Sequence, residues 1–149
     1  MSSERSMVVF ESILSVLTES PLTRDPDGDY VIAYAGAKFY ARVLGEVHPV
    51  VQIFSVVASD LPAIGELYAY LNVVNSQVHH VRVFHVLDQV LVEAELTIDD
   101  LSPASFHKVC RHVAETSDGM AQDLVKEFGG NPRWQHGKKV NYSFGFNMN

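Results

Sequence analysis

The sequence predicts a single α+β domain in which helices pack on an antiparallel sheet. Apolar residues recur at helical spacing in three stretches, strand-like runs lie between these stretches, and turn signals separate the runs. The predicted order is helix, three strands, helix, two strands and helix, followed by a tail. The chain has 149 residues, which suffices for one domain with a sizeable core. We assign residues 2–130 to the domain and residues 131–149 to the tail.

A helix and two strands are expected first. An apolar stripe at helical spacing predicts a helix from about residue 5 to residue 19, and Pro21 ends it. Strands are expected over residues 30–35 and 37–44, with a tight turn at Gly36 between them. Charged side chains alternate along the second of these strands, and we expect that side of it to face water.

The third strand is expected over residues 50–58. This run is apolar on both faces, which is typical of a central strand covered on both sides or of a strand covered by a partner. Val51 and Ile53 are therefore candidate partner-binding residues. The same run favours a homodimer, because helices cover only part of a five-stranded sheet.

The segment Asp25–Asp29 is a turn with three acidic residues. These residues match the first three ligand positions of a calcium loop. The match then fails, because Tyr30 stands where glycine is required and Gly36 stands where the closing glutamate is required. We interpret the segment as a plain turn and expect no metal there.

The helix at residues 60–75 is the element around which the strands are organised. Asp60 is its expected N-cap, and its apolar residues share one face. Tyr68 fits that face and is expected in the core. Tyr70 lies off the face, either as surface decoration or as an anchor for a partner chain.

Two strands are expected after this helix, over residues 78–86 and 90–96. Arg82 in the first strand can pair with a glutamate across the hairpin, either Glu93 or Glu95. Both glutamates lie on one strand face. A solvated face is the favoured interpretation, and paired catalytic carboxylates are the alternative.

The last helix is expected to begin at Ser102-Pro103 and to end at Gly129-Gly130. Its apolar stripe includes Cys110, the single cysteine of the chain. Cys110 forms no internal disulfide and no cysteine-based metal site. A buried thiol is favoured over a nucleophile, because no neighbouring base can be named.

No catalytic or cofactor-binding constellation is present in the sequence. The seven histidines lack the spacing of a metal site: His79 and His80 are adjacent on an expected strand, and His107 and His112 are five residues apart on a helix. There is no serine nucleophile elbow and no glycine-rich phosphate loop. We expect neither an enzyme nor a cofactor.

The charge of the chain is acidic and unevenly distributed. The formal net charge is −7, yet Arg133, Lys138 and Lys139 are the only charged residues after residue 130. An acidic domain repels nucleic acid and anionic lipid, so neither is the expected partner. The N-terminus lacks the pattern of a signal peptide and no run is long enough to span a bilayer, so a cytoplasmic protein is expected.

The tail carries a two-residue period that is typical of a strand with one apolar face. We expect it to dock in extended form against a sheet edge or an apolar face of this chain or of a dimer mate, with its basic residues held by the acidic domain. A disordered end is the alternative, and stacking on single-stranded nucleic acid is a further one. The alternating apolar residues are Val140, Tyr142, Phe144, Phe146 and Met148.

Two short motifs in this order of elements resemble a known family. Asp27-Gly28-Asp29 leads into a strand, and Leu71-Asn72-Val73-Val74-Asn75 closes the middle helix. The chain from about Met7 to Phe128 resembles the YbjN family and its actinobacterial relatives, which are type III secretion chaperone-like peptide-binding proteins. The resemblance implies a secretion-chaperone-like fold that is often dimeric, and it implies protein or peptide binding without chemistry.

Asn72 and Asn75 match the asparagines of that family. Near a helix C-terminus, asparagine satisfies loose backbone groups, so a structural role is favoured over contact with a ligand. Two classes of function remain. One is a chaperone- or adaptor-like module that binds a segment of another protein. The other is a small-ligand or enzymatic domain whose site forms only in three dimensions. The candidate partner-binding residues are Tyr70, Val51, Ile53, Asn72 and Asn75.

Overall fold

A computed structural model of the chain describes residues 3–17, 22–34 and 37–132. The predicted docking of the tail therefore lies outside the described residues, except at its first two positions. The expected order of helices and strands is confirmed, and the structure adds two short strands and one 3-10 turn.

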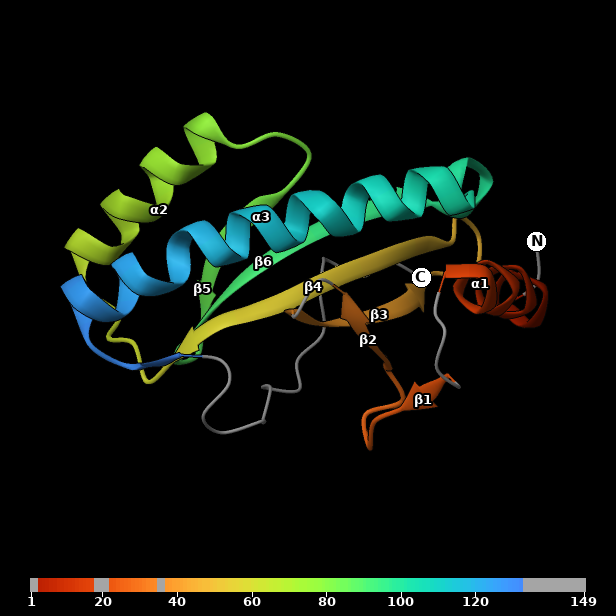
Figure 1. Cartoon of the computed structure of the whole chain (residues 1–149), viewed down its shortest axis with the longest axis horizontal. Coiled ribbons are helices and arrows are strands. Elements are labelled where there is room, and N and C mark those ends of the chain that lie inside the picture. The colour runs from red at the N-terminus through yellow and green to blue at the C-terminus, as the bar shows by residue number, and fades with distance from the viewer. Residues whose placement is uncertain (1–2, 18–21, 35–36, 133–149) are drawn as a thin grey trace.

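All strand pairs of the sheet are antiparallel (Figure 1). The hairpins at residues 30–44 and 82–97 flank the long central strand, which contacts one strand of each. The predicted fourth strand begins at Arg82 rather than at residue 78. Across the sheet the strands are β1 (Thr23–Arg24), β2 (Tyr30–Tyr34), β3 (Ala37–Leu44), β4 (Val50–Ser59), β6 (Gln89–Thr97) and β5 (Arg82–Val86), and β7 (Asn131–Pro132) pairs with β4.

Three helices supply the second layer. They are α1 (Ser3–Leu17), α2 (Gly65–Gln77) and α3 (Pro103–Phe128), and a 3-10 turn, η1 (Ile98–Asp100), precedes α3. The long helix α3 runs over β4 and β6, and α2 lies beside β5 (Figure 1). Helix α1 contacts α3 and β3. The main core lies between these helices and one face of the sheet.

The predicted start of α3 is confirmed. The Ser102 hydroxyl accepts a hydrogen bond from the Ser105 N–H, the Ser105 hydroxyl accepts one from the Ser102 N–H, and Pro103 occupies the first helical position. Phe106 and Leu124 mark the two ends of its buried stripe. Because this stripe is continuous, α3 covers the sheet over most of the length of β4.

The predicted start of α2 is wrong. Asp60 is not its N-cap, because its φ of 57° is left-handed and the helix begins only at Gly65. The intervening loop is held by a hydrogen bond from the Leu61 N–H to the Asp88 carbonyl. Only Leu67 and Leu71 of α2 are buried. The helix therefore presents a narrower apolar stripe to the core than its sequence indicates.

The prediction for Val51 and Ile53 is corrected by the structure. Both side chains are fully buried in the main core, so neither offers a surface to a partner. Their strand, β4, is covered within this chain on the side that faces α3. A register shift between Val56 and Ala58 then places the consecutive residues Val57 and Ala58 on that same side.

The sheet continues beyond the expected domain end at residue 130. Asn131 and Pro132 pair with Ser59 and Ala58 of β4. Gly130 makes this possible, because its φ is 82° and a Cβ at this position would lie 2.5 Å from the Ser59 carbonyl oxygen. The glycine pair that ends α3 therefore also returns the chain to the sheet.

Candidate functional site

A second apolar cluster lies on the sheet face opposite α3. Every member lies on a strand and none lies on a described helix, in contrast to the main core. We call this side the second face and these residues the second cluster. A sheet face of this kind is a candidate binding surface. The second cluster consists of Tyr40, Phe54, Val56 and Leu91, with Val31, Leu44, Phe84 and Val86 packed around them.

Aromatic rings and cations form the β3 side of the second cluster. The rings of Tyr40 and Phe54 stack with centroids 5.4 Å apart, and the Arg42 guanidinium lies 4.9 Å from the Phe54 centroid. Arg42 also pairs with Asp29 at 2.6 Å. The expectation that this side of β3 faces water is therefore wrong, since burial leaves Tyr40 7% exposed and raises its pKa.

Four polar side chains form a seam beside the second cluster. The Arg82 Nε donates to the Glu93 carboxylate at 2.5 Å, and its Nη2 reaches Glu95 at 3.4 Å. The Gln52 amide donates to Glu95 at 2.9 Å. The predicted pairing of Arg82 across the hairpin is confirmed, and it includes both glutamates. We call Gln52, Arg82, Glu93 and Glu95 the polar seam.

The two glutamates of the polar seam differ in environment. Burial raises the pKa of Glu93 to about 7, although its bond with Arg82 acts in the opposite direction. Burial also acts to raise the pKa of Glu95. The hydrogen bonds of Glu95 with Glu93 and Gln52 and the charge of Arg82 outweigh burial, so the pKa of Glu95 is lowered. The prediction of a fully solvated glutamate face is wrong for Glu93, whose side chain is 2% exposed.

A shallow depression of about 310 Å³ opens at the polar seam. It is lined by His80, Val81 and Ala94 together with three residues of the seam. One carboxylate oxygen of Glu93 and the amide oxygen of Gln52 are buried without a hydrogen-bond partner in the described part of the chain. Both oxygens are hydrogen-bond acceptors, and the N–H groups of a peptide backbone or of a basic side chain are donors of matching chemistry.

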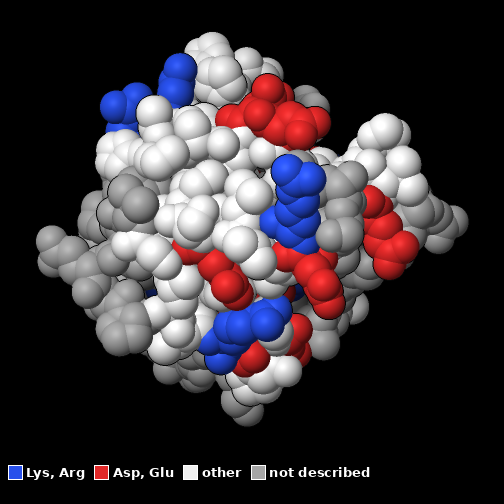
Figure 2. Space-filling view, turned by 90° about the vertical axis from the view of Figure 1, so that its right-hand side faces the viewer, with Lys and Arg blue, Asp and Glu red and all other residues white. Residues whose placement is uncertain are grey.

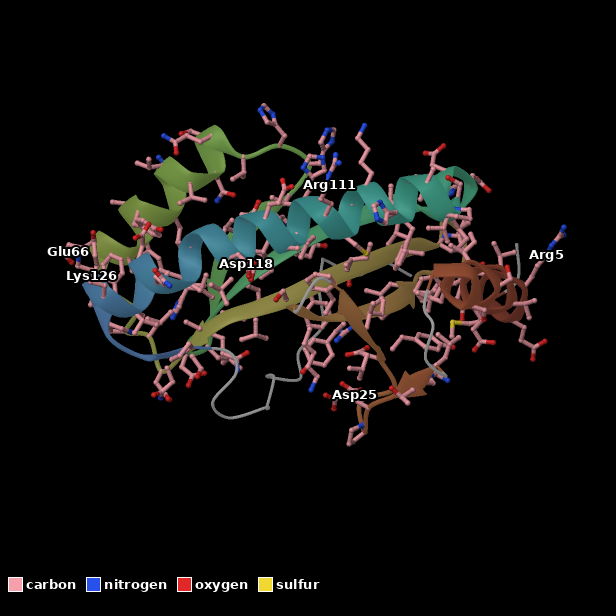
Figure 3. All side chains as sticks on the ribbon, in the orientation of Figure 1. Arg5, Asp25, Glu66, Arg111, Asp118 and Lys126 are labelled. Carbon is pink, nitrogen blue, oxygen red and sulfur yellow. The ribbon has the colours of Figure 1, made fainter. Side chains whose placement is uncertain are left out.

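The acidic turn has structural partners for its carboxylates. One oxygen of Asp25 accepts hydrogen bonds from the backbone N–H groups of Asp27 and Asp29, and Asp29 also pairs with Arg42. The three carboxylates lie within 4.8 Å of one another. Figure 3 shows Asp25 at the turn between β1 and β2, far from the helices. These contacts agree with a turn stabilised by its own side chains.

The two tyrosines of α2 exchange their expected roles. Tyr68 is 49% exposed, so the prediction of a core residue is wrong. Tyr70 packs on Phe128 of α3 with ring centroids 5.8 Å apart, and burial raises its pKa, as do Asp123 and Glu127. The stripe of α2 that packs on the core runs through Leu67, Tyr70, Leu71 and Val74, so Tyr68 lies outside it.

Asn75 of α2 holds the outer edge of β5. Its side-chain amide donates to the Val83 carbonyl and accepts from the Val83 N–H, both at 2.8 Å. The amide therefore occupies the position that a neighbouring strand would take on this edge strand. This geometry agrees with the structural role favoured for Asn75. Asn72 is exposed on the same helix.

Cys110 is buried in the main core, as predicted. Burial raises the pKa of its thiol to about 12. We expect the native protein at neutral pH to react with a thiol reagent only over hours, and the denatured protein to react within seconds. Absorbance after mixing with an aromatic disulfide measures both rates. Labelling of the native protein within seconds would contradict the assignment of an inert thiol.

Two histidines lie differently from their prediction. His79 and His80 precede β5 instead of lying within it, and His80 has a left-handed φ of 65°. The ring of His80 lies 4.9 Å from the ring of His112 on α3. Spacing along the sequence did not indicate this contact, because it depends on how the loop before β5 meets the long helix.

The sequence of the second face contains both charged and large apolar residues, and only the charged residues support the prediction of a face exposed to water. Lys38, Arg42 and Glu93 indicated a wet face, yet large apolar residues share that face at a period of two, among them Tyr40 and Leu91. Mixed charged and apolar residues on neighbouring strands are the pattern that identifies it. The register between strands, which the sequence does not contain, brings them together.

The family model of TY-Chap1, described as "T3SS (YopN, CesT) and YbjN peptide-binding chaperone 1", matches residues 4–136. The chain belongs to the TY-Chap1 family. It is thus a member of a peptide-binding chaperone family, as the resemblance implied. No curated protein matches the chain.

Solved structures share the fold of this TY-Chap1 chain. The type III secretion chaperone SycH of Yersinia pestis, solved with a fragment of YscM2, has 15% identity and a TM-score of 0.52 over 76% of this chain and 98% of its own. ExsC, solved with ExsE, has 13% identity and a TM-score of 0.58, covering 82% and 94%. YbjN of E. coli has 15% identity and a TM-score of 0.56, covering 82% and 93%. These likenesses establish the type III secretion chaperone fold.

One negative finding concerns membranes. Among the helices in the described part of the chain, none has the length and apolar character needed to cross a bilayer.

Proposed function

We propose that this TY-Chap1 chain is a non-catalytic chaperone or adaptor that binds an extended segment of another protein along the second face of its sheet. The second cluster carries the proposal, because strands alone form this apolar cluster on the sheet face opposite α3, and half-buried apolar residues surround its buried members. A segment with a two-residue period places alternate side chains on such a face.

The polar seam gives the bound segment a direction and a chemical preference. Its carboxylates lie at one side of the second cluster, and Arg82 also lies 5.3 Å from the ring of Phe84. An apolar segment that ends in a basic residue matches this arrangement. The family description and the solved complexes, SycH with a YscM2 fragment and ExsC with ExsE, support a protein segment as the ligand.

Nucleic acid fits the described surface poorly. At the end of the molecule that carries α1, acidic and basic side chains of the described residues lie interspersed (Figure 2). Strong nonspecific binding to a phosphate backbone requires a continuous basic patch. The uneven acidic charge of the chain supports the same conclusion, and we propose a cytoplasmic protein partner.

A small-ligand site is the second candidate, and the depression at the polar seam is the observation that favours it. This depression is shallow, and polar atoms form about half of its wall. Small-molecule sites are more often enclosed and mostly apolar. We therefore assign the depression to the peptide surface, where it accepts one side chain of a longer segment.

Binding of displayed peptides tests the proposal. We expect a random peptide library to yield ligands of the full chain with alternating large apolar residues. Fluorescence anisotropy of a selected peptide should show affinity at least about tenfold weaker for Phe84→Ser, because a half-buried ring of the second cluster is lost. Val47→Asn is the control, since Val47 is 72% exposed in the loop between β3 and β4 and lies outside the second cluster. Equal loss in both variants would contradict the proposal.

We further propose that the chain forms a homodimer through α2 and the turn between β5 and β6. Residues 51–58 do not supply the interface of this dimer, because all of them are buried within the chain. Exposed apolar side chains on α2, in the loop before it and in the turn between β5 and β6 support the dimer instead. They are Ile64 at 40%, Tyr68 at 49%, Val73 at 51% and Leu87 at 68% exposure.

Light scattering at micromolar concentration checks the dimer. We expect the mass of two chains for the natural protein and of one chain for Tyr68→Asp, because a charge at the centre of an apolar interface costs several kcal/mol when unpaired. Val47→Asp is the control, since Val47 is 72% exposed in the loop between β3 and β4. A monomeric natural protein would contradict the dimer.

A further inference from the structure

We propose that the depression at the polar seam takes a cationic side chain of the bound segment, and that this cation enters in exchange for a proton that Glu93 releases to the solvent. The inference rests on the proposed function and adds to it a ligand chemistry and a dependence on pH. A segment with an arginine or lysine at this point then binds more tightly as the pH rises.

The depression lies where β6 extends past the start of β5. Arg82, the first residue of β5, pairs with Glu93, and β6 continues beyond this pair without β5 beside it. The residues that line the depression come from the segment before β5, from Arg82 and from this part of β6. The Glu93 carboxyl therefore stands at the last position where the two strands pair, with the open depression beside it.

One oxygen of this carboxyl lacks a donor. The Arg82 Nε donates to Oε2 of Glu93, whereas Oε1 is buried without a hydrogen-bond partner in the described part of the chain. The side chain is 2% exposed, yet Glu93 lines the depression. A buried acceptor without a donor costs free energy, and an N–H group of a basic side chain in the depression removes that cost.

The charges that line the depression are unequal in number. Arg82 bonds to both Glu93 and Glu95, so this one guanidinium balances one of two carboxylates. A proton balances the other, because burial and a hydrogen bond to Glu95 raise the pKa of Glu93 to about 7. The cation of a ligand supplies the same positive charge as this proton. The two therefore compete for one carboxyl.

The remaining charged or titratable groups near this carboxyl come from β3 and from the segment before β5. Strand β4, which lies between β3 and β6, has none. On β3, Arg42 is paired with Asp29 at 2.6 Å, and the Lys38 amine lies 5.7 Å from the centroid of the Tyr40 ring. His80 lines the depression itself, and its protonated ring opposes the entry of a cation. The test therefore separates His80 from Glu93.

NMR of the side-chain carboxyl carbons in the full chain tests the exchange without a peptide. We expect n-butylguanidinium to lower the titration midpoint of Glu93 by about one pH unit at ten times its dissociation constant, because it binds the ionised carboxyl. The neutral analogue n-butylurea and an equal concentration of sodium chloride should leave the midpoint unchanged. A midpoint that n-butylguanidinium does not move further than these controls would overturn the proposal.

A library peptide that contains a basic residue measures the exchange in a bound segment. We expect its affinity for the natural chain to rise about tenfold from pH 6 to pH 8, and less than about twofold for Glu93→Gln. We expect this variant to fold, because the glutamine amide imitates the protonated carboxyl. His80→Asn is the matched control from the same depression, since asparagine accepts the left-handed φ of 65° there. It should keep a rise of at least about fivefold.

The outcomes distinguish the exchange from the proposed function. Library peptides that bind the second face without a basic residue, or with equal affinity at both pH values, would overturn the exchange and still support the proposed function. A pH dependence that is lost in His80→Asn and kept in Glu93→Gln would also overturn it. A midpoint lowered by n-butylguanidinium in a chain that binds no library peptide would support the cation site and contradict the proposed function.

Discussion

Replacing Glu93 by glutamine should remove a large pH dependence from the stability of this protein. Glu93 has a pKa of about 7 in the folded chain, against an ordinary value of 4.5. Between these values the folded chain keeps a proton that the unfolded chain has released. The contribution of Glu93 to stability is therefore complete below pH 4.5, falls as the pH rises, and is lost above pH 7.

The size of this effect follows from the shift of the pKa. At 1.36 kcal/mol per unit, the free energy of unfolding should fall by about 3 kcal/mol between pH 4.5 and pH 8 because of this one group. Urea denaturation of the natural protein and of Glu93→Gln at both pH values measures it. Relative to the natural protein, the free energy of unfolding of Glu93→Gln should increase by that amount as the pH rises.

Glu95→Gln is the control with the opposite sign. The pKa of Glu95 is lowered in the folded chain, so its contribution is present above its unfolded pKa and is lost as the pH falls. Removing Glu95 should therefore flatten the acid side of the profile. It should keep a decline toward pH 7 that is smaller than in the natural protein, because Glu95 also helps to raise the pKa of Glu93. A natural protein and a Glu93→Gln variant with parallel pH profiles would show that Glu93 is not a buried, protonated group.

Replacing Asn75 by alanine should lower the free energy of unfolding by about 2 kcal/mol. The substitution removes two hydrogen bonds to Val83, each worth about 1 kcal/mol. It also leaves the backbone of an edge strand open to pairing with another chain, which is a cause of aggregation. Urea denaturation gives the first effect, and light scattering during storage gives the second.

Asn72→Ala is the natural comparison, because Asn72 is exposed one helical turn earlier on α2. Its stability should lie within about 0.5 kcal/mol of the natural protein. Similar losses of stability in both variants would mean that Asn75 stabilises α2 itself and not the edge of β5.

The order of elements could be predicted from the sequence because local signals are strong in this chain. Ser102-Pro103 begins α3, and the hairpin strands have regular alternation. The start of α2 could not be predicted from the same kind of signal. Asp60 is a good N-cap residue, but here it takes a left-handed conformation in a loop whose next residue, Leu61, bonds to Asp88. That hydrogen bond joins segments that are far apart in the sequence, so no local signal indicates it.

The candidate site was only partly predictable for a related reason. The pairing of Arg82 across the hairpin follows from two adjacent strands and was predicted. The burial of Glu93 and Phe54 depends on the register between β4 and β6, which places the two residues opposite each other. Val51 and Ile53 were selected because their strand is apolar on both faces, yet the period of two places them under α3. The partner-binding roles of Tyr70 and Asn72 remain predictions.

The most direct test of the proposed function is a titration of the full chain, labelled at its methyl groups, with a selected peptide and observed by NMR. The account predicts that signals of the second cluster shift, including those of Val56, Val86 and Leu91, while those of the main core, such as Val113 and Leu124, stay in place. Shifts confined to α2, or binding without any shift at the second cluster, would contradict the assignment of the second face as the binding surface.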